Sequence, residues 1–362
     1  VFRGVGRPGH LAFLYTGQGS QYVNMLDTLR RTEPIVRDTF IEADAVMEPI
    51  LGKPLTDYIF IDTDDPDAVR ASEIDLMQTE ITQPAVLTVD LALQRLMAAY
   101  GIEPSMVMGH SLGEYGALVA ADALPFEDAL RAVAGRGREM ANVQVDDRGS
   151  MAAVFAPIND IERVVESVDD YVVVANVNSN HQAVIGGSTA GVEAAAELLA
   201  AAGAQVVPLP VSHAFHTEIV APASAPLMEM LATMDVRSPS MPIVANTTGD
   251  FYPRGPQVDR EMIEILGQQI FSPVQFVKGL ETLYRAGARV LCEIGPKKAL
   301  HGMAEDVLGS HGDVRVLFAN HPKQGDLVSF NQALCGMYAA GLGTGRVAHD
   351  VPHDAPDVEV PQ

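Results

Sequence analysis

A serine flanked by glycines lies between a short apolar segment and an alanine-rich segment, and this feature limits the possible folds most. Residues 105–108 are SMVM, the next five are Gly109–Gly113 (GHSLG), and helical patterning continues to Ala121. A short apolar segment bounded by a turn is typical of a strand buried in a parallel sheet. The segment 11–15 (LAFLY), which also leads into a glycine-rich turn, predicts a second such strand. Strands that lead through tight turns into helices indicate an α/β fold with a parallel sheet.

The pattern Gly109-x-Ser111-x-Gly113 matches a nucleophile elbow. Glycine is needed on both sides of the serine because a sharp strand-to-helix turn leaves no room for Cβ atoms. Such a turn would expose Ser111 at a helix N-terminus, where the N–H of Leu112 points toward an oxyanion. A glycine–serine turn without chemistry has the same pattern, so these residues alone leave both interpretations open.

A serine nucleophile needs a base, and two of the ten histidines stand together in the segment Ser212–His216 (SHAFH). A lone histidine is more often structural than catalytic, so position alone selects neither His213 nor His216. The acidic residues between Ser111 and these histidines have no distinguishing context. We therefore expect a serine–histidine dyad whose histidine is oriented by a neutral acceptor, such as a backbone carbonyl.

Residues 150–210 have a pattern of their own, which predicts a small inserted subdomain. The expected strands are 151–155, 172–177, 182–187 and 205–209, and the expected helices are 158–168 and 188–202. Asn159 or Asp160 is expected to cap the first of these helices. The order β-α-β-β-α-β is that of a ferredoxin-like unit. The predicted division is a core of residues 1–149 and 211–345, a subdomain of residues 150–210, and a linker or tail of residues 346–362.

Within the predicted core, the apolar segment from Ala85 to Tyr100 indicates a helix that begins just after Pro84 and ends at Gly101. The core is expected to resume near Val211, with further strands around residues 242–245 and 290–294. No internal repeat of the solenoid type is visible in the sequence.

Composition excludes several classes of protein. A chain of 362 residues, 48% of them hydrophobic, is long enough for about two domains and a sizeable core, so global disorder is excluded. The net charge of −23 opposes binding to nucleic acids and to anionic membranes. No apolar run approaches the roughly 18 residues of a membrane span. Cys292 and Cys335 fit neither a zinc pattern nor a disulfide framework, which favours the reducing cytoplasm. The start at Val1 and the proline-rich residues 348–362 are typical of a domain cut from a longer polypeptide.

Five segments, in order, resemble the malonyl-CoA:acyl-carrier-protein transacylase family, which includes the acyltransferase domains of polyketide and fatty acid synthases. They are Gly17–Gln21 (GQGSQ), Gly109–Tyr115 (GHSLGEY), Arg136–Met140 (RGREM), His213–His216 (HAFH) and Gln269–Val274 (QIFSPV). The resemblance covers roughly residues 11–340 and implies an α/β-hydrolase-like core with a ferredoxin-like subdomain. The motif TGQGSQY and the acidity of the chain resemble those of iterative synthases of the polyunsaturated fatty acid or enediyne kind.

The resemblance implies a role for each residue of the catalytic group. Ser111 would be the nucleophile, and His216 would take its proton and later activate the incoming thiol. The N–H groups of Leu112 and Gln18 would form the oxyanion hole, where the loss of one donor typically costs about 3–4 kcal/mol of barrier. A main-chain carbonyl holds the histidine in this family, and here that carbonyl belongs to Gln269.

The substrate-binding residues follow from the same resemblance. Arg136 would bind the free carboxylate of malonyl through a bidentate fork, whereas composition alone would suggest a surface arginine. Phe215 would narrow the pocket where an α-methyl branch must sit, although ordinary core packing also explains a phenylalanine. His110 is assigned to substrate binding, and Asn178 and Asn246 lie in segments that resemble the family's pocket walls.

Two positions of the QIFSPV segment limit what the resemblance implies. Ser272 stands where many relatives have asparagine, so local hydrogen bonding there is expected to differ. Gln269 is expected to act through its backbone, so the identity of its side chain should carry little information.

The implied partners are malonyl-CoA as donor, the pantetheine thiol of an acyl carrier protein as acceptor, and neighbouring domains of a multidomain synthase. No metal and no redox or other cofactor is implied, and neither nucleic acid nor membrane is an expected partner. Carrier proteins are usually acidic, so a chain that is itself acidic needs a local basic patch to bind one. The alternative is that its basic residues form only a solvated face. The candidates are Lys297, Lys298, Arg285 and Arg289 in one group and Arg131, Arg136 and Arg138 in another.

Two other functions remain open on the sequence. A serine thioesterase or esterase would use the same elbow and deliver the acyl group to water, but it needs neither Arg136 nor the Gln18 segment. A catalytically silent docking or scaffold domain would form no covalent adduct at all.

Overall fold

A five-stranded parallel sheet forms the centre of the larger part of the fold. The computed structural model describes residues 8–63 and 65–346. The strand order is β10-β9-β1-β2-β7, and every neighbouring pair is parallel. The strands are β1 (His10–Tyr15), β2 (Met106–Gly109), β7 (Ile243–Val244), β9 (Ala288–Ile294) and β10 (Arg315–Phe318).

The central strand β1 is buried from Leu11 to Tyr15, without a charged residue, because both faces of this sheet are covered. Leu11, Phe13 and Tyr15 belong to the largest hydrophobic cluster, whereas Ala12 and Leu14 point the other way into a second cluster. This alternation follows from the two-residue period of a strand, and burial on both faces removes any need for polar residues. The carboxyl ends of β1 and β2 meet at one edge, where loops of parallel sheets commonly carry functional groups.

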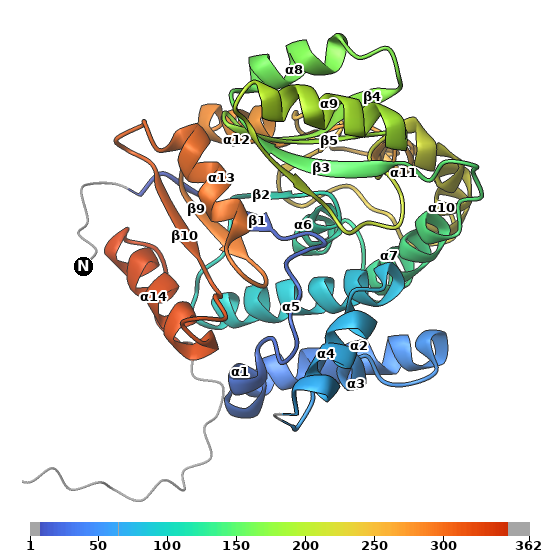
Figure 1. Cartoon of the computed structure of the whole chain (residues 1–362). Helices are drawn as coiled ribbons and strands as arrows, with labels where there is room; N and C mark the ends of the chain where they lie inside the picture. Colours follow the sequence, from blue (N-terminus) through green and yellow to red (C-terminus); the bar gives the residue numbers. More distant parts are fainter. Residues whose placement is uncertain (1–7, 64, 347–362) are drawn as a thin grey trace, which may run out of the picture.

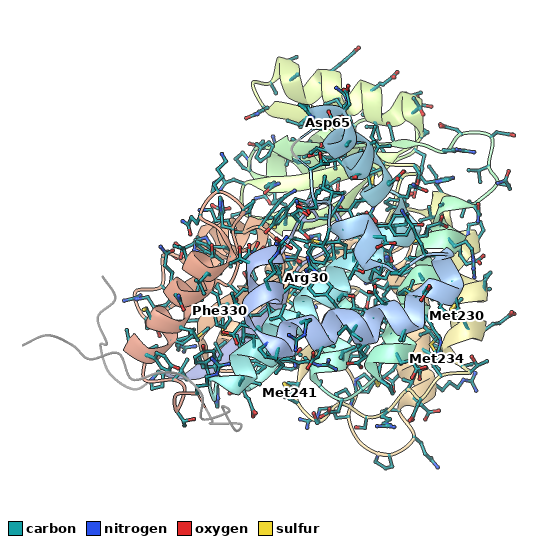
Figure 2. All side chains as sticks on the ribbon, turned by 90° about the horizontal axis from the view of Figure 1, so that it is seen from below. Arg30, Asp65, Met230, Met234, Met241 and Phe330 are labelled. Atoms are coloured by element: carbon teal, nitrogen blue, oxygen red, sulfur yellow. The ribbon has the colours of Figure 1, made fainter. Side chains whose placement is uncertain are left out.

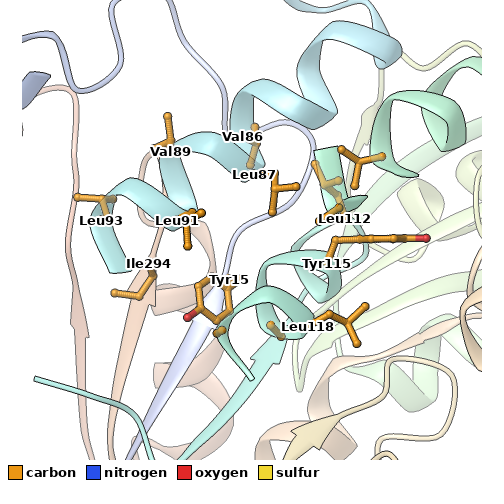
Figure 3. Close-up of a cluster of buried hydrophobic side chains, with 14 of the residues drawn as sticks. Tyr15, Val86, Leu87, Val89, Leu91, Leu93, Leu112, Tyr115, Leu118 and Ile294 are labelled. Carbon is orange, nitrogen blue, oxygen red and sulfur yellow. The ribbon is translucent and has the colours of Figure 1, made fainter. Parts of the chain in front are cut away.

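Helices cover the two faces of this sheet (Figure 1). On the first face, α5 (Thr79–Ala99) and α6 (Gly113–Ala120) pack against the ends of β1 and β9. Figure 3 shows their side chains gathered around Tyr15, with Leu91 from α5 and Leu118 from α6. On the second face lie α12 (Phe276–Arg285) and α13 (Ala299–Leu308).

Further helices enclose the first face and flank the sheet. They are α1 (Asp27–Thr32), α2 (Pro34–Leu51), α3 (Thr56–Ile59), α4 (Pro66–Leu76), α7 (Phe126–Ala141), α10 (Ser224–Leu231), α11 (Asp259–Gln269) and α14 (Asp326–Ala339), with a 3-10 helix at Glu218–Ala223. Seen from below, Figure 2 shows Arg30 on α1, Asp65 at the start of α4 and Phe330 on α14.

A second sheet carries the inserted unit. Its order is β6-β3-β5-β4-β8, formed by β3 (Ser150–Phe155), β4 (Val172–Ser179), β5 (Gln182–Gly187), β6 (Gln205–Pro208) and β8 (Val274–Gln275). The first four strands pair antiparallel, and α8 (Ile158–Glu166) and α9 (Thr189–Ala201) cover one face (Figure 1). Ser188 caps α9 by accepting a hydrogen bond from the N–H of Gly191. β8 joins β4 in parallel and extends this sheet with a strand from the later part of the chain.

The predicted fold class is confirmed: an α/β core with a parallel sheet is accompanied by a β-α-β-β-α-β unit. The division at residues 149 and 210 stays a prediction, and β8 lies outside the stretch assigned to the subdomain. Of the predicted tail 346–362, all but Arg346 lies outside the described residues.

Two local predictions were wrong. Helix α5 begins at Thr79 rather than after Pro84, and Pro84 lies inside it. A proline there removes one helical hydrogen bond, but the residues on both sides are buried in the core, and their burial outweighs that loss. Helix α8 is capped by Pro157, whose carbonyl accepts the N–H of Asp160, so neither predicted cap residue acts as one.

Within the described residues, none of the helices combines the length and the apolar character that crossing a membrane requires.

We predict that Gly109→Ala disrupts the fold at the elbow. A Cβ on Gly109 would lie 1.9 Å from the main-chain carbon of Gly113, so backbone would have to move. The expected loss is about 2 kcal/mol or more in the free energy of unfolding. The matched control is Gly302→Ala in α13, where an added Cβ meets nothing within 4 Å. That change should raise stability by about 0.5–1 kcal/mol. Equal unfolding midpoints in urea for the two variants would contradict the steric argument.

Candidate active site

The turn between β2 and α6 holds Ser111 in a strained conformation. Its φ is 53°, in the left-handed region that a non-glycine residue seldom adopts. Asn246, which follows β7, holds this turn with two hydrogen bonds. Its Oδ1 accepts the N–H of Ser111 at 2.6 Å, and its Nδ2 donates to the carbonyl of Gly109 at 2.7 Å. A Cβ on Gly113 would lie 2.1 Å from the carbonyl oxygen of Tyr15, so the elbow also packs tightly against β1.

A histidine lies within hydrogen-bond distance of the serine hydroxyl. The Oγ of Ser111 is 2.7 Å from the Nε2 of His216. On the other side of the ring, Nδ1 donates to the carbonyl oxygens of Gln269 at 3.0 Å and Ser272 at 3.2 Å. Two carbonyl acceptors assign the proton to Nδ1 and leave Nε2 free to accept the serine proton.

Burial, reinforced by the charge of Arg136 and by His110, lowers the pKa of His216 to about 3. The imidazole is therefore neutral at ordinary pH, which is the form that a general base requires.

Arg136 of α7 places a buried positive charge beside the serine. Its side chain is 1% exposed, and its Nη2 lies 3.4 Å from the Oγ of Ser111. Two amide oxygens hold the guanidinium: Nη1 donates to Oε1 of Gln83 at 3.0 Å, and Nη2 donates to Oε1 of Gln269 at 3.1 Å. Among the described residues no carboxylate lies within ion-pair distance, and Nε has no partner. Burial lowers the pKa of Arg136.

A cavity of about 1320 Å³ opens onto these groups. Its lining includes most of the residues that the sequence singled out: Gln18, His110, Ser111, Arg136, Asn178, Phe215 and His216. Leu112 and Gln269 are not among the lining residues, but the main-chain carbonyl of Gln269 contacts His216, which is. The cavity is large enough for a drug-sized or larger ligand.

Comparisons with known proteins identify the family of this chain. The acyl transferase domain family matches residues 12–341. The chain belongs to this family. It is 36% identical over 302 residues to malonyl CoA-acyl carrier protein transacylase from Bacillus subtilis, covering 82% of this chain and 90% of that protein.

Two solved structures show the same fold as this acyl transferase domain. One is the acyltransferase domain from the second module of the salinomycin polyketide synthase, with a TM-score of 0.80 and 30% identity over 92% of this chain and 74% of that one. The other is a malonyl-transacylase in complex with its type II polyketide synthase acyl-carrier protein, with a TM-score of 0.78 and 31% identity over 90% and 99% of the two chains.

In this acyl transferase domain two backbone N–H groups were predicted to form the oxyanion hole. The N–H groups of Gln18 and Leu112 donate no hydrogen bond to another group of the described residues. The loop that carries Gln18 is tied to the elbow, because the N–H of His110 donates to the carbonyl of Tyr15 at 3.1 Å. The Nε2 of His110 also lies 2.7 Å from Oδ1 of Asn178 and thereby links the elbow to β4.

Three buried residues of the site were missed by sequence reasoning. Gln83 contacts Arg136, and Glu114 and Tyr252 form a hydrogen bond of 2.6 Å behind Gln269. Only Glu114 had a visible signal, since an acid one helical turn after a nucleophile serine lies close to it. Burial raises the pKa of Glu114 to about 7, although hydrogen bonds from Tyr252 and Gln269 oppose that rise.

The side chain of Gln269 makes contacts in addition to the one expected of its backbone. Its amide contacts Arg136, the carbonyl of Ser111 and the carboxylate of Glu114, so the identity of this side chain matters.

The predicted basic groups differ in what surrounds them. In the second group Arg136 is buried, Arg131 pairs with Glu127, and Arg138 pairs with Glu139, so these residues do not form a patch. In the first group Arg289 pairs with Asp313 at 2.7 Å. Also in this group, Arg285 donates to the hydroxyl of Thr282 at 3.0 Å. Lys297 lines the cavity and donates to the carbonyl of Gly19 at 3.1 Å. Neither Lys297 nor Lys298 has a carboxylate within 4 Å in the described part of the chain.

Both cysteines are free thiols, with Cys292 buried and Cys335 exposed. Within residues 8–63 and 65–346, no group of three or more histidine, cysteine, aspartate or glutamate side chains is placed to hold a metal ion.

The low pKa of His216 predicts that formation of the acyl-serine is insensitive to mild acid. A base whose pKa lies near 3 stays neutral as the pH falls through 6.5, where an ordinary histidine becomes protonated and inactive. We expect the acid limb of the acylation rate below about pH 5, measured by rapid-quench mass spectrometry. Arg136→Ala removes a nearby positive charge, so in that variant the limb should shift to higher pH. A limb at pH 6.5 in both proteins would contradict this prediction.

Proposed function

We propose that this domain transfers a malonyl group from malonyl-CoA to the pantetheine thiol of an acyl carrier protein through a malonyl-serine ester. The observation that carries the proposal is the guanidinium of Arg136, which is buried without a carboxylate partner 3.4 Å from the nucleophile. An unpaired buried charge is unfavourable, so the site is built for a ligand that brings the opposite charge. Malonyl brings that charge at the end opposite its thioester.

In the first half of the reaction, the Oγ of Ser111 attacks the thioester carbonyl while the Nε2 of His216 accepts the serine proton. The N–H groups of Leu112 and Gln18 stabilise the oxyanion. The carbon–sulfur bond then breaks, and the CoA sulfur leaves with the proton from His216. In the second half His216 takes the proton of the carrier thiol, the sulfur attacks the ester carbonyl, and Ser111 leaves with that proton. This is a ping-pong scheme that needs no metal or redox cofactor.

Selectivity for a diacid follows from the position of Arg136. A malonyl carboxylate can accept two parallel hydrogen bonds from the guanidinium, whereas an acetyl group leaves the buried charge unpaired. Phe215, which is buried and lines the cavity, forms a rigid wall against α-methyl branches. His110 and Asn178, joined at 2.7 Å, form another part of the wall around the acyl group.

The carrier protein is proposed to dock beside the cavity mouth, where Lys297 and Lys298 supply unpaired positive charge to an acidic partner. A related transacylase has been solved in complex with its acyl-carrier protein. We also propose a cytoplasmic location, which the two free cysteines favour. Placement among neighbouring domains of a synthase, and among iterative synthases in particular, stays a prediction.

Hydrolysis by a thioesterase or esterase is the less favoured function, because a hydrolase has no need of the buried guanidinium. A silent docking domain is disfavoured by the 2.7 Å contact between Ser111 and a neutral histidine.

The direct test is the mass of the protein after incubation with malonyl-CoA. We expect a malonyl adduct on Ser111 that passes to a carrier thiol faster than to water, and Ser111→Ala should form none. Rapid release of free malonate without carrier transfer would instead indicate a hydrolase. An unmodified wild-type protein would indicate a docking domain.

Replacing the guanidinium tests the carboxylate role separately. In Arg136→Ala we expect malonyl loading to fall at least about 100-fold, because the substrate carboxylate loses its partner in a buried site. Acetyl loading should change by less than about threefold, since acetyl makes no such ion pair. The measurement is kcat/KM for adduct formation with each acyl-CoA. Equal losses on both substrates would assign Arg136 a structural role only.

A further inference from the structure

The side-chain amide of Gln269 lies between groups that only accept hydrogen bonds and a group that only donates them. Its Nε2 donates to the carbonyl of Ser111 at 2.6 Å and to Oε2 of Glu114 at 2.9 Å. Its Oε1 accepts from Nη2 of Arg136 at 3.1 Å. In the opposite orientation, Oε1 would face two acceptors and the NH2 group would face the guanidinium. The surroundings therefore allow one orientation of this amide.

Glu114 is the side-chain acceptor that, together with the carbonyl of Ser111, sets this orientation, and it is completely buried in α6. Its Oε1 accepts from the hydroxyl of Tyr252 at 2.6 Å and from the N–H of Asn246 at 3.2 Å, while its Oε2 accepts from Gln269. A carboxylate offers an acceptor at both oxygens. An amide in the same place has one acceptor end only, so it cannot satisfy both the N–H of Asn246 and the NH2 of Gln269.

We propose that Glu114 is a positioning residue for diacid selectivity: it orients the amide of Gln269, and that amide holds Arg136 where the guanidinium can bind the carboxylate of the substrate. This inference rests on the proposed function and extends it to a residue that touches neither the substrate nor the reacting atoms. Glu114 acts through two successive hydrogen bonds, from Gln269 to its carboxylate and from Arg136 to the Gln269 amide.

The geometry of Arg136 explains why this support matters. The guanidinium is held by two amide oxygens, those of Gln83 and Gln269, on two different nitrogens. If Gln269 turned its NH2 group toward Arg136, donors would face donors, and the guanidinium would move away from the nucleophile. A displaced guanidinium loses bidentate binding of a carboxylate, but it changes little for a substrate that lacks one.

The test compares malonyl and acetyl loading of Ser111 in Glu114→Gln, with kcat and KM determined separately for each acyl-CoA. We expect the KM for malonyl-CoA to rise about tenfold, as for loss of a hydrogen bond to a charged group, and the malonyl-over-acetyl ratio of kcat/KM to fall by a similar factor. The matched control is Tyr252→Phe, which removes a hydrogen bond from the same carboxylate on the oxygen away from Gln269. Its ratio should stay within about threefold of wild type.

A double-mutant cycle shows whether Glu114 acts through Arg136. In an Arg136→Ala background, Glu114→Gln should lower the remaining malonyl-over-acetyl ratio by less than about twofold, because the group that it positions is gone. An unchanged ratio in folded Glu114→Gln, an equal loss on both substrates, or a full additional loss in the double variant would overturn the proposal.

Folding is checked by thermal unfolding before any rate is compared. If Glu114→Gln does not fold, Gln269→Leu decides, since removing the amide should lower the same ratio, and an unchanged ratio refutes the proposal. Failure of the proposed function has a different signature: the wild-type protein itself would then form no malonyl adduct on Ser111.

Discussion

The site depends on one buried positive charge. Arg136 lies in the interior, and among the described residues its fixed partners are neutral amides rather than a carboxylate. Desolvation of an unpaired guanidinium is costly, and the protein meets that cost only in part through hydrogen bonds. The remaining unfavourable free energy favours binding of a ligand with a free carboxylate, because that carboxylate pairs with the guanidinium. Burial lowers the pKa of His216, and the charge of Arg136 lowers it further, so the ligand site and the base are linked through one residue.

Tight backbone contacts place the nucleophile in relation to that charge. The elbow packs against β1 through Gly113, and Asn246 forms hydrogen bonds with Gly109 and Ser111 of the turn. The main-chain carbonyl of Gln269 orients His216, and the side chain of the same residue contacts Arg136. One residue of α11 therefore connects base, charge and elbow, which explains how segments distant in the chain maintain a common geometry.

Local patterns were predicted well where local sterics or burial determine them. Strand β5 was predicted with the bounds that the structure has, because a short apolar segment between turns is typical of a buried strand. The start of α5 was missed because burial of the residues before Pro84 overrides a local helix-breaking signal. The side-chain role of Gln269 was missed because its partners come from α6, α7 and the elbow, and no residue spacing in the sequence predicts that these segments come into contact.

The sequence by itself determined the α/β class, the elbow around Ser111 and the need for a base held by a neutral acceptor. The first two follow from short-range effects, such as backbone crowding at glycines. The third follows from the absence of a distinctive acid in the sequence. Only the tertiary structure decided that Arg136 is buried beside the serine, and that Gln83, Glu114 and Tyr252 complete the polar network. The physical reason is that hydrogen bonds and desolvation depend on distances between segments far apart in the chain.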